Sequence, residues 1–369
     1  MNAVTIDLTN IARILKDFAR VLDACGQVRR AESYRVAMAA IDGKIATMIP
    51  LPHDDAMRTV TIRALILIPG IGVGIANKIY EAINTGEIAE MRAMMADPEV
   101  SAKVMFNDIV GVGPATAERW VMAGYRTIDD LRKAVADGIV TLTSMQTCGL
   151  SCFDDLRKPI PREDVADIGA ILRGYILAHI PDAIFDIAGS YRRELPFSGD
   201  IDCLVTSPSG ANNSLLAKII ADMTHDDMTH DDMPHDPYWN RSEHDGSVQE
   251  IYKNAHSIEY VCTLMNGDSR VSFVVKWRGI ARQVDLLLVP YESYFAALTY
   301  FTGSYSFNET MRSVAKQRNM LLNQHGLWKL GATKKLIPTR SEQEVFVRVG
   351  IEWVLPRDRK SGQNVIRHQ

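Results

Sequence analysis

The chain has 369 residues, of which 47% are hydrophobic and 23% charged, as in ordinary globular proteins with two to four compact modules. Its net charge is −4, but residues 222–236 hold six aspartates and no lysine or arginine, so the remainder carries +2. These numbers exclude a strongly basic nucleic-acid binder, and the lack of an 18-residue apolar run or a signal peptide predicts an intracellular protein that is neither secreted nor membrane-bound.

The N-terminal part is predicted to be helical. Apolar residues recur at helical spacing within residues 5–49. Residues 65–83 then combine an apolar helical turn, a hairpin containing Gly70 and Gly72, and a second helix, and residues 106–124 repeat this pattern with Gly111 and Gly113. One such glycine pair is typical of an ordinary turn, but two copies with matching apolar flanks predict paired helix-hairpin-helix motifs whose backbone N–H groups face phosphates.

A Pro-started helix over 160–180 leads into the segment GSYRRELPFSGDID, which ends at Asp200 and Asp202. Residues i and i+2 of a strand share a face, so these two carboxylates would converge, and a divalent cation would relieve their repulsion. A bare Asp-x-Asp is more often a surface turn with stray charges. The preceding Gly-Ser turn and the pair Arg192 and Arg193 favour a site for a metal-bound polyphosphate instead.

Residues 215–220 are predicted to be helical, and a tandem THDDM repeat follows over 223–237. Its repeated histidines and aspartates suggest a row of metal-binding sites. The segment lacks any apolar period, however, so a disordered insert at about 222–247 is the preferred interpretation. Segments 258–264, 271–277 and 283–289 are predicted strands. Residues after Tyr291 are predicted to mix helix with short strands.

Asp285 interrupts the apolar third strand, which Pro290 ends. A carboxylate in a buried strand is costly unless it binds something, although a strand-end aspartate satisfied by local N–H groups is the alternative. Together with Asp200 and Asp202 it forms a candidate triad for two-metal phosphoryl transfer. The five scattered cysteines argue against a disulfide framework, and all five are expected to be reduced.

These motifs, in this order, resemble those of family X DNA polymerases of the DNA polymerase beta type over about residues 10–357. The resemblance is to a minimal or viral member of the family, with no domain expected before the lyase-like region. The pieces that carry the resemblance are PGIGVGIANKI, VGVGPATAERW, IPRED, GSYRRELPFSGDID, QVDLLLVP and YFTGSYSFNETMR. It implies an α+β multidomain fold: a lyase-like helical domain (1–97), a DNA-binding subdomain (98–160), a nucleotidyltransferase-type palm (161–291) and a small α/β nucleotide-selecting subdomain (292–369).

The resemblance also implies site residues. The triad would bind two Mg²⁺ ions, for which Mn²⁺ substitutes. The positions matching contacts to the incoming dNTP are Gly189, Ser190, Arg193, Gly199, Tyr300, Phe301, Gly303 and Asn308. Those matching DNA contacts are Tyr34, Arg35, Gly70, Gly72, Gly111, Gly113 and Arg312. Backbone carbonyls matching Na⁺ or K⁺ sites belong to Ile66, Ile68, Ile71, Asn107, Ile109 and Val112.

Lys78 matches a lysine that forms a Schiff base with the abasic sugar in a deoxyribose-phosphate lyase reaction, with a phosphate-binding lysine as the alternative. Three departures from the family pattern, Gly74, Asn77 and Glu90, leave that activity open. In the palm, Gln283 and Leu287 replace two arginines beside Asp285.

The resemblance therefore favours a gap-filling DNA polymerase of DNA repair, a monomer acting on gapped or nicked duplex DNA and dNTPs in the nucleus or at a viral or cytoplasmic replication site, with repair proteins such as a DNA ligase as partners. Two alternatives stay open. One is a template-independent terminal nucleotidyltransferase, and the other is a non-catalytic DNA-end binder, against which a complete triad argues.

Overall fold

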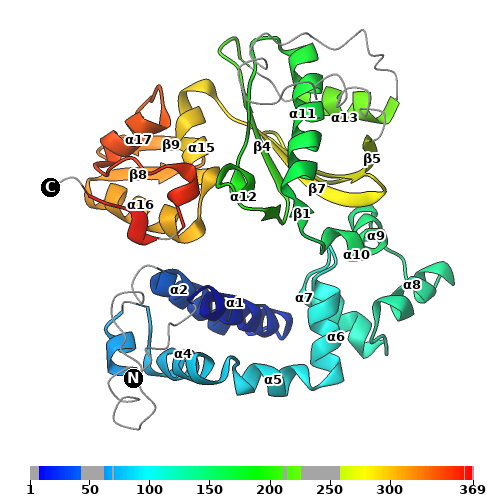
Figure 1. Ribbon diagram of the computed structural model, residues 1–369. Coiled ribbons are helices and arrows are strands. Elements are labelled where there is room, and N and C mark those ends of the chain that lie inside the picture. The colour runs from blue at the N-terminus through cyan, green and yellow to red at the C-terminus, as the bar shows by residue number, and fades with distance from the viewer. Residues whose placement is uncertain are drawn as a thin grey trace. The chain divides into compact units, whose positions relative to one another are not determined.

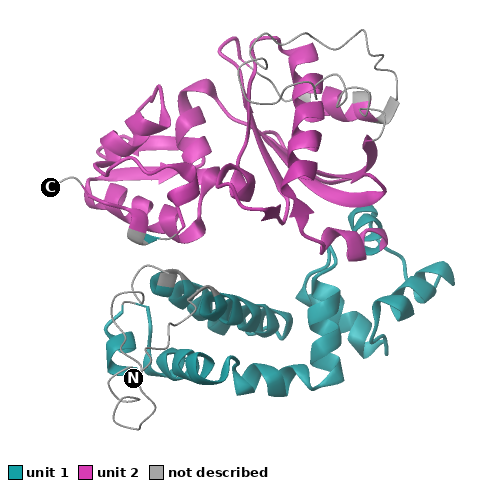
Figure 2. Cartoon of the chain, viewed as in Figure 1, with its two compact units in different colours: residues 1–150, 361–363 teal, residues 151–360, 364–369 magenta. Residues whose placement is uncertain are grey.

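The computed structural model describes residues 8–42, 62–68, 70–210, 214–225, 258–360 and 362–367. The chain divides into two compact units, residues 1–150 with 361–363 and residues 151–360 with 364–369 (Figure 2). Within the described ranges we find no helix with the length and apolar character needed to span a membrane.

The first unit is helical (Figure 1). Its helices are α1 (Leu8–Ala24), α2 (Val28–Asp42), α4 (Val73–Thr85), α5 (Ala89–Met95), α6 (Pro98–Asn107), α7 (Pro114–Met122), α8 (Ile128–Ala136) and α9 (Ser144–Ser151). Gly26, with φ of +72°, lies between α1 and α2. Leu15 and Phe18 of α1 are fully buried in a core with residues of α2 and α4. The predicted helix over 5–49 is confirmed for 8–24 and 28–42, and its remaining ends lie outside the described residues.

The two predicted hairpins are structurally equivalent, which confirms the repeat. In each, a turn is closed by an N–H that donates to the carbonyl three residues earlier, Ile71 to Ile68 at 3.1 Å and Val112 to Ile109 at 2.9 Å. Each turn contains a glycine with positive φ, +92° at Gly70 and +82° at Gly111. The next glycines, 72 and 113, are the N-cap residues of α4 and α7. The free N–H groups of both helix N-termini follow directly.

The second unit is built on a five-stranded mixed sheet of order β2-β4-β7-β6-β5. Its strands are β2 (Ile184–Ile187), β4 (Ile201–Thr206), β5 (Ile258–Asn266), β6 (Arg270–Trp277) and β7 (Ile280–Leu288). The accompanying elements are α10 (Phe153–Leu156), β1 (Ile160–Pro161), α11 (Arg162–His179), α12 (Gly189–Arg192), β3 (Phe197–Ser198) and α13 (Ser214–His225), with β1 and β3 paired antiparallel. β4 and β7 are parallel neighbours, and the other pairs are antiparallel.

Side-chain alternation divides this sheet into two faces. Ile201, Cys203 and Val205 of β4, with matching residues of β6 and β7, pack under α11 and α13 (Figure 1). Leu204 and Leu287 point to the opposite face and pack against α15 (Tyr294–Thr302). Asp202 and Asp285, each two residues before one of these leucines, therefore share that second face.

The C-terminal part holds a small antiparallel sheet of β8 (Met320–Asn323), β9 (Gly326–Lys329) and β10 (Lys335–Leu336). Its helices are α15, α16 (Tyr305–Gln317) and α17 (Glu342–Val349), with short 3₁₀ turns η5 (Tyr291–Ser293), η6 (Pro356–Asp358) and η7 (Gly362–Asn364). Phe307, Met311 and Phe346 are fully buried in its core. The elements form an α+β fold, as the sequence predicts.

Helix α13 continues through His225, so the start of the predicted insert is helical, and residues 226–257 with most of the THDDM repeat lie outside the described residues. Cys25, Cys152 and Cys203 are free thiols. Cys148 and Cys262 are each disulfide-bonded, so the expectation of five reduced cysteines is wrong for these two. The division into four domains stays a prediction.

Candidate active site

Three carboxylates converge on one face of the five-stranded sheet, beside the start of β4. Asp202 of β4 is the register partner of Asp285 on β7, so their side chains lie side by side on one face. Asp200 lies in a bend just before β4 and is not part of the strand, which corrects the expected geometry but not the convergence. One oxygen from each of Asp200, Asp202 and Asp285 lies within 4.8 Å of the others.

Gly189 allows the Gly-Ser turn to approach the triad closely. It has φ of +55°, and a Cβ at this position would lie 2.5 Å from Asp202 Oδ2. Only glycine fits both the left-handed backbone and this contact. Ser190, next in the chain, donates its hydroxyl to Ser198 Oγ at 2.7 Å, so the two ends of the motif are joined.

The negative charge of the triad is only partly compensated by nearby arginines. Desolvation, followed by the charges of Asp200 and Asp285, raises the pKa of Asp202 to about 7, while Arg270 and Arg193 act in the opposite direction. Desolvation and the Asp285 charge also raise the pKa of Asp200. Three convergent carboxylate oxygens are the donor set that Mg²⁺ and Mn²⁺ prefer, so these residues fit divalent cations.

The raised pKa of Asp202 predicts a pH dependence of stability in chelator-treated protein. The folded state binds this proton more tightly than the unfolded chain, so the free energy of unfolding falls as pH rises from the ordinary 3.8 toward about 7. We expect the loss to be about 2–4 kcal/mol and to be absent in Asp202→Asn. Denaturant unfolding with EDTA across this range measures it. Parallel pH profiles for wild type and variant would contradict the assignment.

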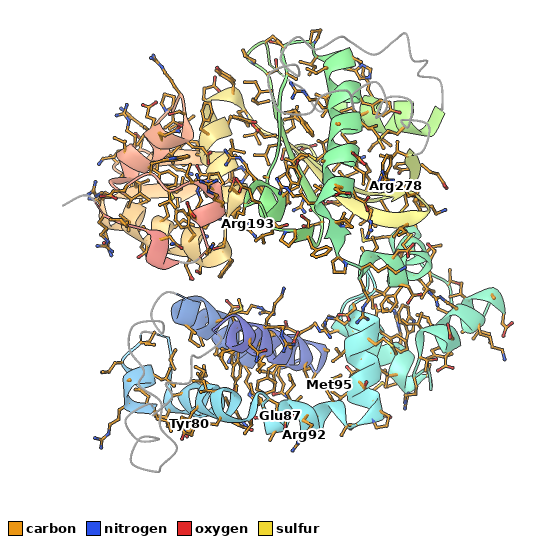
Figure 3. The ribbon with its side chains drawn as sticks, in the orientation of Figure 1. Tyr80, Glu87, Arg92, Met95, Arg193 and Arg278 are labelled. Carbon is orange, nitrogen blue, oxygen red and sulfur yellow. The ribbon has the colours of Figure 1, made fainter. Side chains whose placement is uncertain are left out.

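The two arginines of the motif have different surroundings. Arg192 Nη2 lies 2.5 Å from Glu342 Oε2, and its Nη1 donates to Thr302 Oγ1 at 2.8 Å. Its charge is therefore used inside the protein, contrary to the expectation that both arginines face a polyphosphate. Arg193 follows α12 (Figure 3), and its Nη1 donates to the Thr302 carbonyl at 2.6 Å. Burial lowers the pKa of Arg193, while Asp202 opposes the shift.

The other nucleotide-contact candidates form a linked group in the same unit. Asn308 Nδ2 donates to the Tyr300 carbonyl at 2.5 Å, and the Tyr300 and Phe301 rings pack edge-on with centroids 5.2 Å apart. Gly303 has φ of +65° and lies against Arg193, whose Nη1 would be 3.2 Å from an added Cβ. Gly199 faces open space, as its added Cβ would meet nothing within 4 Å. Arg312 is exposed on α16, one turn beyond Asn308.

In the first unit, Lys78 is enclosed by acidic partners. Its Nζ lies 3.2 Å from Glu81 Oε2 and 3.4 Å from Glu90 Oε2, and Arg30 Nη2 lies 2.8 Å from Glu90 Oε1. Partial burial alone would lower the pKa of Lys78, but Glu81 and Glu90 outweigh it and raise the pKa. A nucleophilic lysine requires the neutral amine, so this arrangement opposes Schiff-base chemistry.

The residues expected to support Lys78 separate into two environments. Tyr34 is buried, interacts with Arg30, Lys78 and Glu90, and has its pKa raised by desolvation first and by Glu90. Arg35 instead pairs with Asp23 and Glu32.

The carbonyls of Ile68 and Ile109 accept the turn-closing hydrogen bonds of the hairpins. The monovalent-cation sites at the hairpin carbonyls stay predictions.

Sequence reasoning missed two residues of the triad's surroundings. Ser272 Oγ donates to Asp285 Oδ1, and Arg270 Nη2 donates to Asp285 Oδ2 at 2.5 Å. Both lie on β6, whose pairing with β7 sets them beside Asp285. The predicted strand 271–277 includes Ser272 but begins one residue after Arg270, and its register against the strand of Asp285 was not visible in the sequence. The ion pair between Lys78 and Glu81 could have been predicted, because residues three apart on a helix lie on the same face.

A parallel strand pair that brings three acids together beside a Gly-Ser turn defines a nucleotidyltransferase-type palm. Family models match in the same order: a SAM-like helix-hairpin-helix tandem at 62–123, the fingers domain of DNA polymerase lambda at 104–157, the DNA polymerase beta palm at 159–291 and the DNA polymerase beta thumb at 297–360. The chain belongs to the family X DNA polymerases, a family that uses divalent metal ions.

Curated relatives agree. The chain is 29% identical over 302 residues to DNA polymerase lambda of Rattus norvegicus, covering 79% of this chain and 48% of the relative. It is 28% identical over 311 residues to a DNA nucleotidylexotransferase of Monodelphis domestica (80% and 58%), and 28% identical over 303 residues to that of Bos taurus (80% and 58%). The chain thus spans about half the length of the curated relatives it matches.

Proposed function

We propose that the protein is a DNA-directed DNA polymerase that fills short gaps, adding a dNMP to a primer 3′ hydroxyl with release of pyrophosphate. The observation that carries this proposal is the convergence of Asp200, Asp202 and Asp285 within 4.8 Å beside the Gly189 turn. Mere DNA binding has no use for three converging carboxylates, which argues against a non-catalytic end binder. Gapped or nicked duplex DNA and dNTPs are the proposed partners.

In this proposal Asp200, Asp202 and Asp285 would hold the two ions, with Asp285 nearest the primer 3′ hydroxyl. The two Mg²⁺ ions, when bound, supply a lowered pKa at the 3′ hydroxyl and charge neutralisation on the triphosphate. Arg193 and Ser190 orient the phosphates. Tyr300, Phe301 and Gly303 lie against the sugar, and Asn308 against the base-pair edge. The hairpin N–H groups hold DNA phosphates without reading sequence, and monovalent Na⁺ or K⁺ is proposed at their carbonyls.

The second candidate is a template-independent nucleotidyltransferase, which the similarity to two DNA nucleotidylexotransferases supports. A one-nucleotide-gapped duplex with Mg²⁺ and single dNTPs separates the candidates. Our proposal predicts extension only by the dNTP that complements the template base. Extension of single-stranded ends by any dNTP would favour the transferase, and tight DNA binding without extension by wild type would favour the end binder.

We further propose that lyase activity is weak because Glu90 and Glu81 keep Lys78 charged. Borohydride trapping on a 5′-abasic substrate should give little adduct with wild type. Glu90→Gln should give about fivefold more adduct or a larger excess, because removing one acidic partner lowers the pKa of Lys78. Lys78→Ala in the Glu90→Gln background is the control and should remove the adduct. Strong wild-type trapping that Glu90→Gln leaves unchanged would overturn this interpretation.

A further inference from the structure

Strand β6 supplies the direct partners of Asp285. Ser272 is the register partner of Asp285 on the antiparallel strand, and Arg270, two residues earlier, shares the same face. Ser272 donates to Asp285 Oδ1, and Arg270 Nη2 donates to Asp285 Oδ2 at 2.5 Å. Both oxygens of this carboxylate are therefore engaged by one neighbouring strand.

The pair is asymmetric in exposure. The Asp285 side chain is only 3% exposed, whereas that of Arg270 is 42% exposed. The carboxylate is fixed within the sheet, whereas the Arg270 side chain is partly exposed and its Nε is buried without a hydrogen-bond partner. A buried carboxylate that loses its counter-ion is strongly disfavoured unless another cation replaces it.

The remaining neighbours on β7 offer no charge to Asp285. Gln283 Nε2 is 3.5 Å from Asp285 Oδ1, at the limit of a hydrogen bond, and Leu287 is buried among apolar residues. These are the two positions where the family resemblance leads one to expect arginines. In this chain the positive charge beside Asp285 comes instead from β6, where Arg270 also acts on the charges of Asp200 and Asp202.

We propose that Arg270 is a positioning residue that holds Asp285 as its counter-ion and competes with the divalent cation for that carboxylate. This rests on the proposed role of the triad as a metal site. A guanidinium and a divalent cation a few ångströms apart repel each other, so cation binding requires Arg270 to release Asp285 Oδ2. Arg270 thus sets the metal concentration at which the triad fills.

The test is Mn²⁺ binding to the full chain without DNA or nucleotide, measured by electron paramagnetic resonance. Arg270→Met removes the charge while keeping the length of the side chain, and we expect the Kd for Mn²⁺ to fall about fivefold or more. Arg270→Lys keeps the charge and should stay near the wild-type value. The matched control is Lys276→Met, which removes a charge from the same strand where Lys276 pairs with Glu259 at 3.3 Å; it should not change the affinity.

Thermal unfolding gives a second readout. The rise in Tm on adding Mn²⁺ should be larger for Arg270→Met than for wild type, because the bare triad is less compensated and the metal binds more tightly. If Arg270→Met does not fold, Arg270→Gln retains a donor to Asp285 and should show the same two changes. Unchanged or weaker Mn²⁺ binding in the folded variant would overturn the proposal. Failure of gap filling with these metal-binding changes intact would overturn the polymerase function but not the role of Arg270.

Discussion

Asp202→Asn should abolish nucleotide addition, with a loss of about 1,000-fold or more in kcat, while the folded protein persists. The reason is that one carboxylate of the triad serves both proposed ions, and losing metal-based charge stabilisation costs several kcal/mol in the transition state. The change also removes the Asp202 carboxyl, whose pKa is raised to about 7. Above that pH the metal-free variant should therefore be at least as stable as metal-free wild type. Single-turnover extension of a gapped duplex measures the first effect, and denaturant unfolding measures the second.

Glu259→Gln is the matched control, because Glu259 lies on β5 of the same sheet and is exposed. It should retain wild-type activity. Extension by Asp202→Asn at a rate within tenfold of wild type would remove Asp202 from the chemistry and leave the triad without its central member.

The second large effect is expected from Gly189→Ala. The added methyl group would meet Asp202 Oδ2 at 2.5 Å, and φ of +55° is unfavourable for alanine. We expect the turn to shift away from the triad and kcat to fall about 100-fold or more, because displacements near 1 Å in a catalytic constellation have such effects. Stability should fall by about 1–2 kcal/mol.

Gly210→Ala separates backbone strain from the clash with the triad. Gly210 has φ of +88° in the loop after β4, and an added Cβ there meets nothing within 4 Å. It should lose similar stability while keeping its activity. If both variants lose activity equally, close approach to Asp202 is not what Gly189 contributes.

The parts of the fold that follow local rules were predictable from the sequence. The two hairpins repeat a glycine pair that requires positive φ at Gly70 and Gly111, and both angles are found. The strand of Asp285 was visible as an apolar run, and its convergence with Asp200 and Asp202 followed from side-chain alternation and family resemblance.

What the sequence did not show depends on pairing between distant segments. The register of β6 against β7 brings Arg270 to Asp285, and nothing near either residue specifies that register. Arg192 looked like a phosphate ligand because it adjoins Arg193, but Glu342, 150 residues away, takes its charge. Likewise Glu90 reached Lys78 only through the folding of α5 beside α4.

The most direct test of the two-ion triad is anomalous diffraction from crystals grown with Mn²⁺, a one-nucleotide-gapped duplex and a non-hydrolysable dNTP. We expect two manganese peaks bound by the carboxylates of Asp200 and Asp202, with the peak nearer the primer also bound by Asp285. A single peak, or no ion in contact with Asp285, would contradict the proposed chemistry.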